Sequence, residues 1–239
     1  MVKTVVATGT LSGLVTWHLS HRSSVLLYRP EPYHFILGVG DTITTQTSYD
    51  CLDWDRNVYT VTVLPLDLSS LPSMQSLAEN VRSRLGPHKL NYLILCASTL
   101  DSADGPGPNG SPWCAGLVVN HLAQHYLIYL LRDSLSASQS RVVVVSSGAI
   151  RNVRGQDPAS SMGLLMDIPD TKSIPEGARN LLQAFAANDL LSDPEQIFLT
   201  SWGEWWPKDV IHCPWTRTSK ESGAGREKRL KGLSGLPGV

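Results

Sequence analysis

The stretch TVVATGTLSGL, residues Thr4 to Leu14, starts as a short apolar run and ends in two glycines, Gly9 and Gly13, separated by three residues. This spacing is typical of a phosphate-binding turn. Glycines let the backbone turn sharply and approach a pyrophosphate, and free N–H groups in the following helix favour its negative charge. A nucleotide cofactor is therefore the leading hypothesis. The alternative is a strand-to-helix turn of the same spacing that binds no ligand.

Composition and charge limit the kinds of protein that this chain can be. Its 239 residues, 42% of them hydrophobic, suffice for one substantial core, so we expect one globular domain over residues 1–215. A formal net charge of -1 favours neither nucleic acid nor an anionic membrane as partner. The four cysteines form no CxxC pair, and no apolar run approaches the roughly 20 residues that span a bilayer. We therefore expect a cytoplasmic protein without a transmembrane helix.

Strand-like and helix-like runs alternate along the chain. The strand-like runs are residues 2–8, 33–38, 59–66, 90–97, 141–147 and 196–201, and the helix-like runs are 74–85, 118–135 and 176–186. This alternation predicts an α/β fold with a mainly parallel sheet. Residues 101–112 (DSADGPGPNGSP) are predicted to form a loop close to where ligands bind, and the basic segment 216–239 is predicted to be disordered.

Further motifs appear where the short-chain dehydrogenase/reductase family has its own. TGTLSG (residues 8–13) resembles the family's TGxxxGxG turn, and LPLDL (64–68) resembles its third strand, which ends in an acidic residue. LCAS (95–98) stands at the place of the NAG motif, Asn120 at that of the helix-borne active-site asparagine, and Ser147 at that of the catalytic serine. The stretches VVNHLAQHYL and IFLTSWGEWWPKD are similar to reductases of fungal secondary metabolism.

This resemblance implies a Rossmann-type doubly wound parallel sheet and an NAD(P)-dependent oxidoreductase acting on a small alcohol or ketone. In that family the serine holds the substrate oxygen, the asparagine supports a proton-relay water, and the acidic residue of the third strand contacts adenine. The implied catalytic residues are Ser147 and Asn120. The implied cofactor-binding residues are Gly9, Thr10, Leu11, Ser12, Gly13, Leu14, Asp41, Asp67, Leu68, Ala97 and Ser98. The family often forms homodimers through the helices that flank its fifth strand.

The chain departs from the family pattern after Ser147. The family's Tyr-x-x-x-Lys motif should fall near Ser160 and Leu164, yet no tyrosine follows Tyr129, so no proton donor is assigned. The 28 residues between Ser147 and the helix-like run at 176–186 are too few for a helix-plus-strand crossover, which needs roughly 30 or more. We therefore predict a truncation between about residues 150 and 172 that removes the sixth-strand unit. Either the run 196–201 then pairs with 141–147, or the valines of 141–147 form an exposed edge of the sheet.

The choice between NADP and NAD stays open at this stage. Gly40 stands where an arginine often grips the 2′-phosphate of NADP, and Asp41 follows it, although Arg22 or Arg29 could replace that arginine. Val15 replaces the third glycine of the turn, and its branched side chain would crowd the helix against the sheet. These changes suggest a relaxed constraint on cofactor binding.

Two other readings of these segments are disfavoured. His121 and His125 have the spacing of metal ligands on a helix, but the glutamate of a zinc-protease helix and a third ligand are missing, so we predict no metal site. Ser147 lies in VSSGA, which lacks the GxSxG turn of a hydrolase nucleophile.

Two hypotheses of different classes remain. The first is an active short-chain dehydrogenase/reductase with a small-molecule substrate. The second is a pseudoenzyme, a catalytically inactive or truncated relative that at most binds nucleotide. The missing tyrosine and lysine favour the second on chemical grounds, because a hydride transfer needs a partner for the proton.

Overall fold

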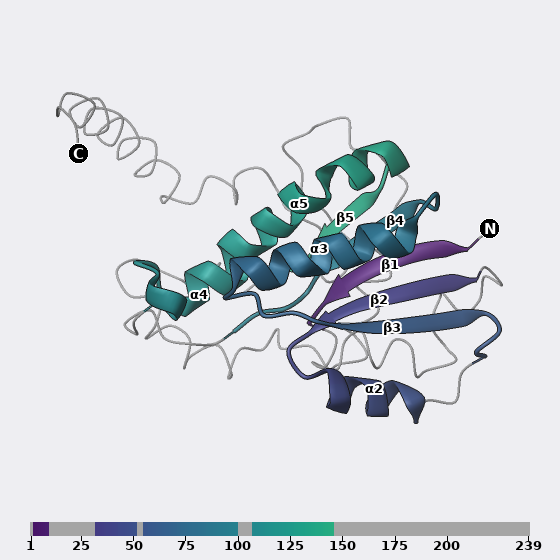
Figure 1. Ribbon diagram of the computed structural model, residues 1–239, viewed down its shortest axis with the longest axis horizontal. Coiled ribbons are helices and arrows are strands. Elements are labelled where there is room, and N and C mark those ends of the chain that lie inside the picture. Colours follow the sequence, from purple (N-terminus) through teal and green to yellow (C-terminus); the bar gives the residue numbers. More distant parts are fainter. Residues whose placement is uncertain (1, 10–31, 52–54, 100–106, 146–239) are drawn as a thin grey trace, which may run out of the picture. The chain divides into compact units, whose positions relative to one another are not determined.

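The described part of the chain is built on a five-stranded parallel sheet. A computed structural model describes residues 2–9, 32–51, 55–99 and 107–145, all within the first of the two units into which the chain divides, Met1–Ala187. The strands are β1 Lys3–Thr8, β2 Tyr33–Val39, β3 Tyr59–Pro65, β4 Leu90–Leu95 and β5 Arg141–Val144. Their order is β3-β2-β1-β4-β5 and every neighbouring pair is parallel (Figure 1). The predicted α/β fold of Rossmann type is confirmed.

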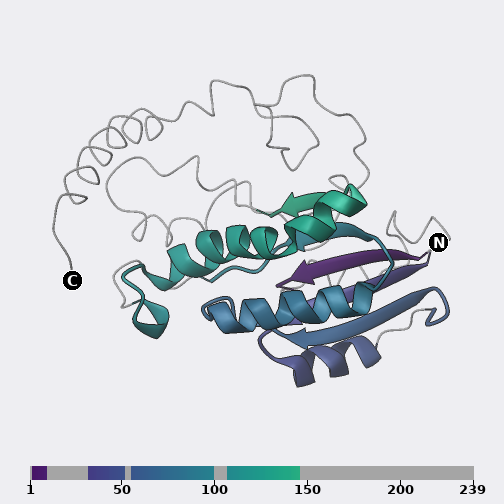
Figure 2. The same cartoon turned by 45° about the horizontal axis from the view of Figure 1, so that its top comes forward.

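Helices cover both faces of the sheet. They are α2 Thr42–Asp50, α3 Leu71–Leu85, α4 Ala115–Leu117 and α5 Ala123–Ser138, with a 3-10 turn at Pro108–Gly110 and a π-helical segment at Val118–Leu122. Helices α3 and α5 lie side by side on one face (Figure 2). They are joined by hydrogen bonds from Arg82 to the Leu130 carbonyl and from Gln75 to the Tyr126 hydroxyl, each 2.9 Å long.

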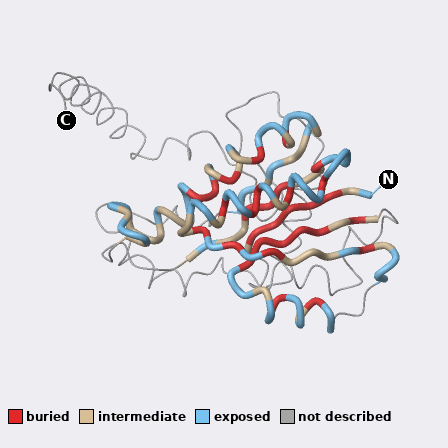
Figure 3. Tube along the Cα trace, viewed as in Figure 1, coloured by how far each residue is buried: buried red, intermediate tan, exposed pale blue. Residues whose placement is uncertain are grey.

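The core lies on both faces because successive strand residues point to opposite sides. Val6 and Ile36 belong to the cluster that includes Met74 of α3 and Leu127 of α5. The neighbouring residues Val5, Ala7, Phe35 and Leu37 belong to the opposite cluster, which includes Tyr49 of α2. Most positions of the central strands are therefore buried, as Figure 3 shows, which explains their largely apolar sequences.

Helix α3 begins three residues before the predicted start at residue 74. Ser70 caps it by accepting a hydrogen bond from the Ser73 N–H. Pro72 lies in the first turn, where a backbone N–H would have no acceptor within the helix, so its absence in proline costs no hydrogen bond. The helix ends where Gly86 adopts a φ of 51°. The capping signal at Ser70 and Pro72, rather than an apolar residue, marks the start of this helix.

Helix α2 was not predicted, because the sequence TITTQTSYD is rich in threonine, which favours strands and turns. Asp41 caps this helix, and the hydroxyls of Thr45 and Thr47 donate to carbonyls one turn earlier. Tyr49, 1% exposed, packs against the sheet. Capping and this buried contact stabilise a helix that propensity alone disfavours.

The predicted helix 118–135 is present within a longer helical stretch. Helical structure extends from Ala115 to Ser138, but it passes through the π-helical segment that contains Asn120. Strands β3, β4 and β5 each end before the predicted residue. The runs 196–201 and 176–186, the truncation at 150–172 and the segment 216–239 lie outside the described residues.

Strand β5 is the last strand of the described sheet and pairs with β4. Val142, Val144 and Val145 are exposed at 37%, 56% and 37% of their surface. Within the described ranges, these three valines are thus exposed, whereas Val143 is partly buried against the core. Whether residues 196–201 pair with them stays a prediction.

Candidate functional site

The predicted cofactor residues that the structure describes follow the carboxyl ends of four neighbouring strands. Gly9 follows β1, Asp41 follows β2, Asp67 follows β3 and Ala97 follows β4. Because the strands are parallel, these residues share one edge of the sheet. The chain reverses its direction of strand addition between β1 and β4, and ligands of open α/β sheets bind beside such a reversal.

Gly9 and Ala97 meet at that reversal. Gly9 has a φ of 73°, and a Cβ atom built on it would lie 2.4 Å from the Ala97 nitrogen and 2.7 Å from the Cys96 carbonyl carbon. Real Cβ atoms do not approach other atoms so closely, so glycine is required here on two counts, conformation and space. The Ala97 N–H also points at the hydroxyl oxygen of the fully buried Thr8, 3.4 Å away. The remaining turn residues predicted to bind cofactor, 10–14, lie outside the described residues.

Asp41 serves as the cap of α2. Its Oδ1 accepts from the Thr44 N–H at 3.0 Å and its Oδ2 accepts from the Thr44 hydroxyl at 2.6 Å. These hydrogen bonds hold the pKa of the Asp41 carboxyl below its ordinary value, so it is ionised at neutral pH. A Cβ on the adjacent Gly40 would meet nothing within 4 Å, which leaves room for a side chain there.

Asp67 organises the turn between β3 and α3. Its Oδ1 accepts from the Ser69 N–H at 2.8 Å and from the Ser69 hydroxyl at 2.6 Å, and neither bond uses Oδ2. Asn109, in the predicted loop 101–112, donates to the Ser69 carbonyl at 3.0 Å and so joins that loop to the turn. Leu68 is 8% exposed and belongs to the core, so a ligand at this turn would meet its backbone rather than its side chain.

Asn120 holds the segment after β4. Its Oδ1 accepts from the Thr99 N–H at 2.8 Å and its Nδ2 donates to the Thr99 carbonyl at 2.9 Å. The side-chain amide therefore pairs with one residue of backbone as a strand would. The π-helical segment that carries Asn120 is a feature often found at functional sites. Ser98 is exposed beside this pair, and burial raises the pKa of the neighbouring Cys96 thiol, which disfavours a reactive thiolate.

Sequence reasoning missed Gln124, a buried polar residue that binds the carbonyls of Ala97 and Val119. The available signal was a long amide one turn after Asn120 on an otherwise apolar helix face. Ser147, the predicted catalytic serine, lies outside the described residues. The rings of His121 and His125 lie 4.6 Å apart in an edge-to-face arrangement. In the described ranges no cluster of three metal-ligating side chains occurs.

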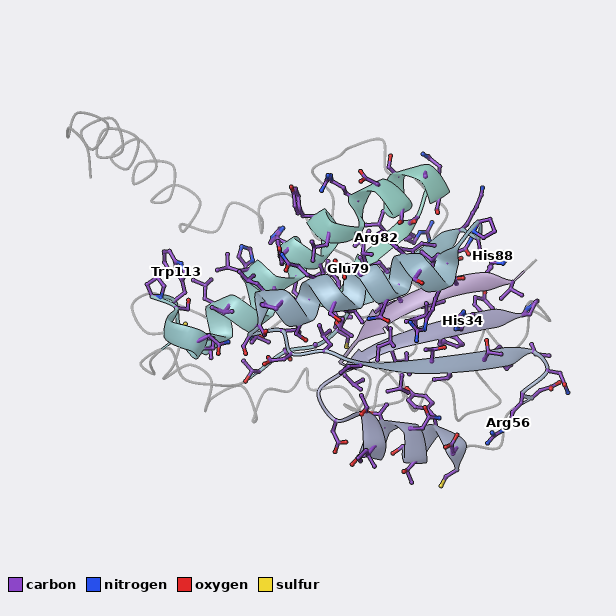
Figure 4. All side chains as sticks on the ribbon, viewed as in Figure 1. His34, Arg56, Glu79, Arg82, His88 and Trp113 are labelled. Atoms are coloured by element: carbon purple, nitrogen blue, oxygen red, sulfur yellow. The ribbon has the colours of Figure 1, made fainter. Side chains whose placement is uncertain are left out.

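Other titratable side chains lie away from this edge. His34, near the start of β2, contacts the Thr62 hydroxyl through Nε2 at 2.9 Å, and burial, with a smaller effect from Arg84, lowers its pKa. His88 lies between α3 and β4, and Glu79 and Arg82 lie along α3 (Figure 4). None of the described helices is long and apolar enough to cross a membrane.

Comparison with known proteins identifies the family. A short-chain dehydrogenase/reductase of Pestalotiopsis microspora is 40% identical over 267 residues, a match that covers 87% of this chain and 90% of that protein. The chain belongs to the short-chain dehydrogenase/reductase family. The WW domain-containing oxidoreductase of Gallus gallus is 32% identical over 120 residues, which cover 47% of this chain and 26% of that protein. No family model matches the chain.

Solved structures agree on the fold of this short-chain dehydrogenase/reductase. A short-chain type dehydrogenase/reductase from Mycobacterium ulcerans superposes with a TM-score of 0.52 at 15% identity, over 68% of this chain and 58% of that one. Sniffer of Caenorhabditis elegans superposes with a TM-score of 0.50 at 22% identity, over 68% of this chain and 74% of that one. The chain thus spans less than two thirds of the Mycobacterium ulcerans protein.

Proposed function

We propose that this chain binds a nicotinamide dinucleotide at the carboxyl edge of the sheet. The observation that carries the proposal is the packing of Gly9, at a φ of 73°, against Ala97 where the strand order reverses. That packing brings the start of the glycine turn to the place where open α/β sheets bind nucleotides. Membership of an oxidoreductase family gives independent support.

The ligand's parts match the residues along this edge. The pyrophosphate would bind residues 9–14, and the adenosine ribose would lie near Asp41. The adenine would lie near Asp67, whose Oδ2 takes no part in the bonds to Ser69. The nicotinamide ribose would lie near Ala97 and Ser98, which follow β4 on the far side of the reversal.

We further propose that the dinucleotide is NAD rather than NADP. Asp41 is fully exposed and ionised, so it would repel the 2′-phosphate of NADP but accept a hydrogen bond from the 2′-hydroxyl of NAD. Each of its oxygens accepts one bond from Thr44, which leaves capacity for another. Gly40 adds no positive charge at this position.

The reaction that fits the family is oxidation of a small alcohol to a ketone, or the reverse. When bound, the nicotinamide would exchange a hydride with the substrate carbon. Ser147 would hold the substrate oxygen, and Asn120 would keep the segment after β4 in place. The proton of the alcohol has no assigned acceptor, because no tyrosine follows Tyr129. A cytoplasmic homodimer acting in secondary metabolism is part of this proposal.

The second candidate is a relative that binds nucleotide without turnover. The absent tyrosine favours it, and so does the length of the match to the Pestalotiopsis microspora protein. That match extends over 267 residues, more than the 239 residues of this chain, so parts of the relative have no counterpart here. A missing sixth-strand unit near residues 150–172 would account for the difference.

Titration of the purified protein with NADH and NADPH, followed by nicotinamide fluorescence, tests the binding proposal. A panel of small alcohols and ketones with the bound cofactor then separates the two candidates. Turnover above the buffer rate supports the oxidoreductase. Saturable binding without turnover supports the inactive relative, and absence of binding contradicts both.

A further inference from the structure

Gln124 stands in the first turn of α5 and is 5% exposed. Its Nε2 donates to the Ala97 carbonyl and to the Val119 carbonyl, each at 3.1 Å. The Ala97 N–H on the other side of the same residue points at the Thr8 hydroxyl oxygen. Ala97 is thus held through both of its backbone polar groups, by a side chain from β1 and by one from α5.

The second bond of Gln124 crosses the irregular part of the helix. Val119 belongs to the π-helical segment Val118–Leu122, whose wider turns leave some carbonyls without their ordinary helical donor. Gln124 reaches back to Val119 and so ties the regular helix α5 to the segment that carries Asn120. Asn120 in turn pairs with Thr99, two residues after Ala97. Two amides on one helix therefore hold the same backbone segment.

Gln124 is a costly residue for this position if stability alone is considered. Its Oε1 is buried, and no described residue donates a hydrogen bond to it. A buried acceptor without a donor destabilises the folded state, so an apolar side chain of similar length would suit the core better. The compensating property of a glutamine is its donor group, which reaches Ala97.

We infer that Gln124 is a positioning residue for nucleotide binding, one that fixes Ala97 against Gly9 and couples the glycine turn to the helix segment of Asn120. Gly9 and Ala97 are in close contact, since a Cβ atom on Gly9 would lie 2.4 Å from the Ala97 nitrogen. A shift of Ala97 would therefore displace Gly9, the first residue of the predicted turn. The inference rests on the proposed nucleotide site.

The test compares the full-length protein with Gln124→Met, which keeps the length of the side chain and removes both the donor and the orphan acceptor. Leu131→Ala is the control, because Leu131 is a core residue on the same helix and has no hydrogen bond to Ala97. Amide hydrogen exchange across residues 95–99 and the Kd for NADH are measured for all three proteins, together with Tm.

We expect Gln124→Met to accelerate exchange at residues 95–99 and to raise the Kd for NADH about fivefold, as the loss of one hydrogen bond implies. Leu131→Ala should lower Tm with little change in that Kd. Unchanged exchange at 95–99 overturns the inference, as does a rise in Kd no larger than that of Leu131→Ala. Failure of the wild-type protein to bind NADH overturns the proposed function itself and the inference with it.

Discussion

A Cβ atom on Gly9 would lie 2.4 Å from the backbone nitrogen of Ala97, although the two residues are 88 positions apart in the sequence. This contact joins the end of β1 to the segment that follows β4. It makes the first glycine of the turn a packing requirement of the sheet as well as a residue of the proposed nucleotide site. The packing of the sheet and the proposed nucleotide binding thus depend on the same residue, and measurements of stability and of binding can separate the two roles.

Gly9→Ala should destabilise the protein by about 2–4 kcal/mol, because it adds both backbone strain and a clash. Gly110→Ala is the matched control, since Gly110 has a φ of 74° and nothing within 4 Å of its Cβ position. It should cost only about 1 kcal/mol, the strain alone. Urea unfolding measures both values. Equal losses in the two variants would show that the contact with Ala97 is not tight in solution.

Gly40→Arg should shift cofactor preference towards NADPH, because the guanidinium would have room beside the ribose and would offset the charge of Asp41. We expect the ratio of the Kd for NADPH to that for NADH to fall about tenfold, which corresponds to about 1.4 kcal/mol. Gly40→Gln, of similar length without charge, is the control. A ratio that moves equally in both variants would point to bulk rather than charge.

Asp41→Asn should abolish a pH-dependent part of the stability. The folded-state pKa of Asp41 is depressed by the bonds from Thr44, so its contribution is present above the ordinary value of 3.8 and is lost as the pH falls through the folded-state pKa. Asparagine still caps a helix but does not titrate. Urea unfolding at several pH values should show a wild-type advantage near neutrality that shrinks below pH 3.8. A constant difference would contradict this role of the carboxylate.

Asn120→Asp should destabilise the segment after β4. The substitution replaces the Nδ2 donor by an oxygen that faces the Thr99 carbonyl, so one hydrogen bond becomes a repulsion. The expected loss is about 1–3 kcal/mol. His121→Asp, at the next and also exposed position, should cost less than about 0.5 kcal/mol. Thermal unfolding measures both losses. Equal losses of stability in the two variants would contradict the pairing of Asn120 with Thr99.

The architecture could be predicted because it depends on signals local in sequence. Apolar runs such as residues 35–39 of β2 identify buried parallel strands. Gly9 follows the first strand at positive φ, whereas the rest of the predicted turn lies outside the described residues. Helix α2 could not be predicted because its many threonines have a low helix propensity. Its stability comes from the cap at Asp41 and from the buried Tyr49. Such stabilisation depends on packing that propensity does not encode.

The positions of three candidate site residues in the fold could be predicted, but their hydrogen bonds could not. Asp41, Asp67 and Ala97 lie at the expected edge, yet the sequence did not reveal that both carboxylates organise turns. The role of Gln124 was missed because its partners, Ala97 and Val119, come together only through the fold and an irregular helix. Contacts of this kind are long-range or depend on a local departure from the α-helical repeat.

The most direct test of the account is the titration of wild-type protein with NADH and NADPH, followed by nicotinamide fluorescence. We expect saturable binding of NADH, tighter than that of NADPH, and loss of this binding in Gly9→Ala under conditions where the variant remains folded. Absence of NADH binding at all accessible concentrations would contradict the claim that the carboxyl edge around Gly9 and Ala97 is a nucleotide site.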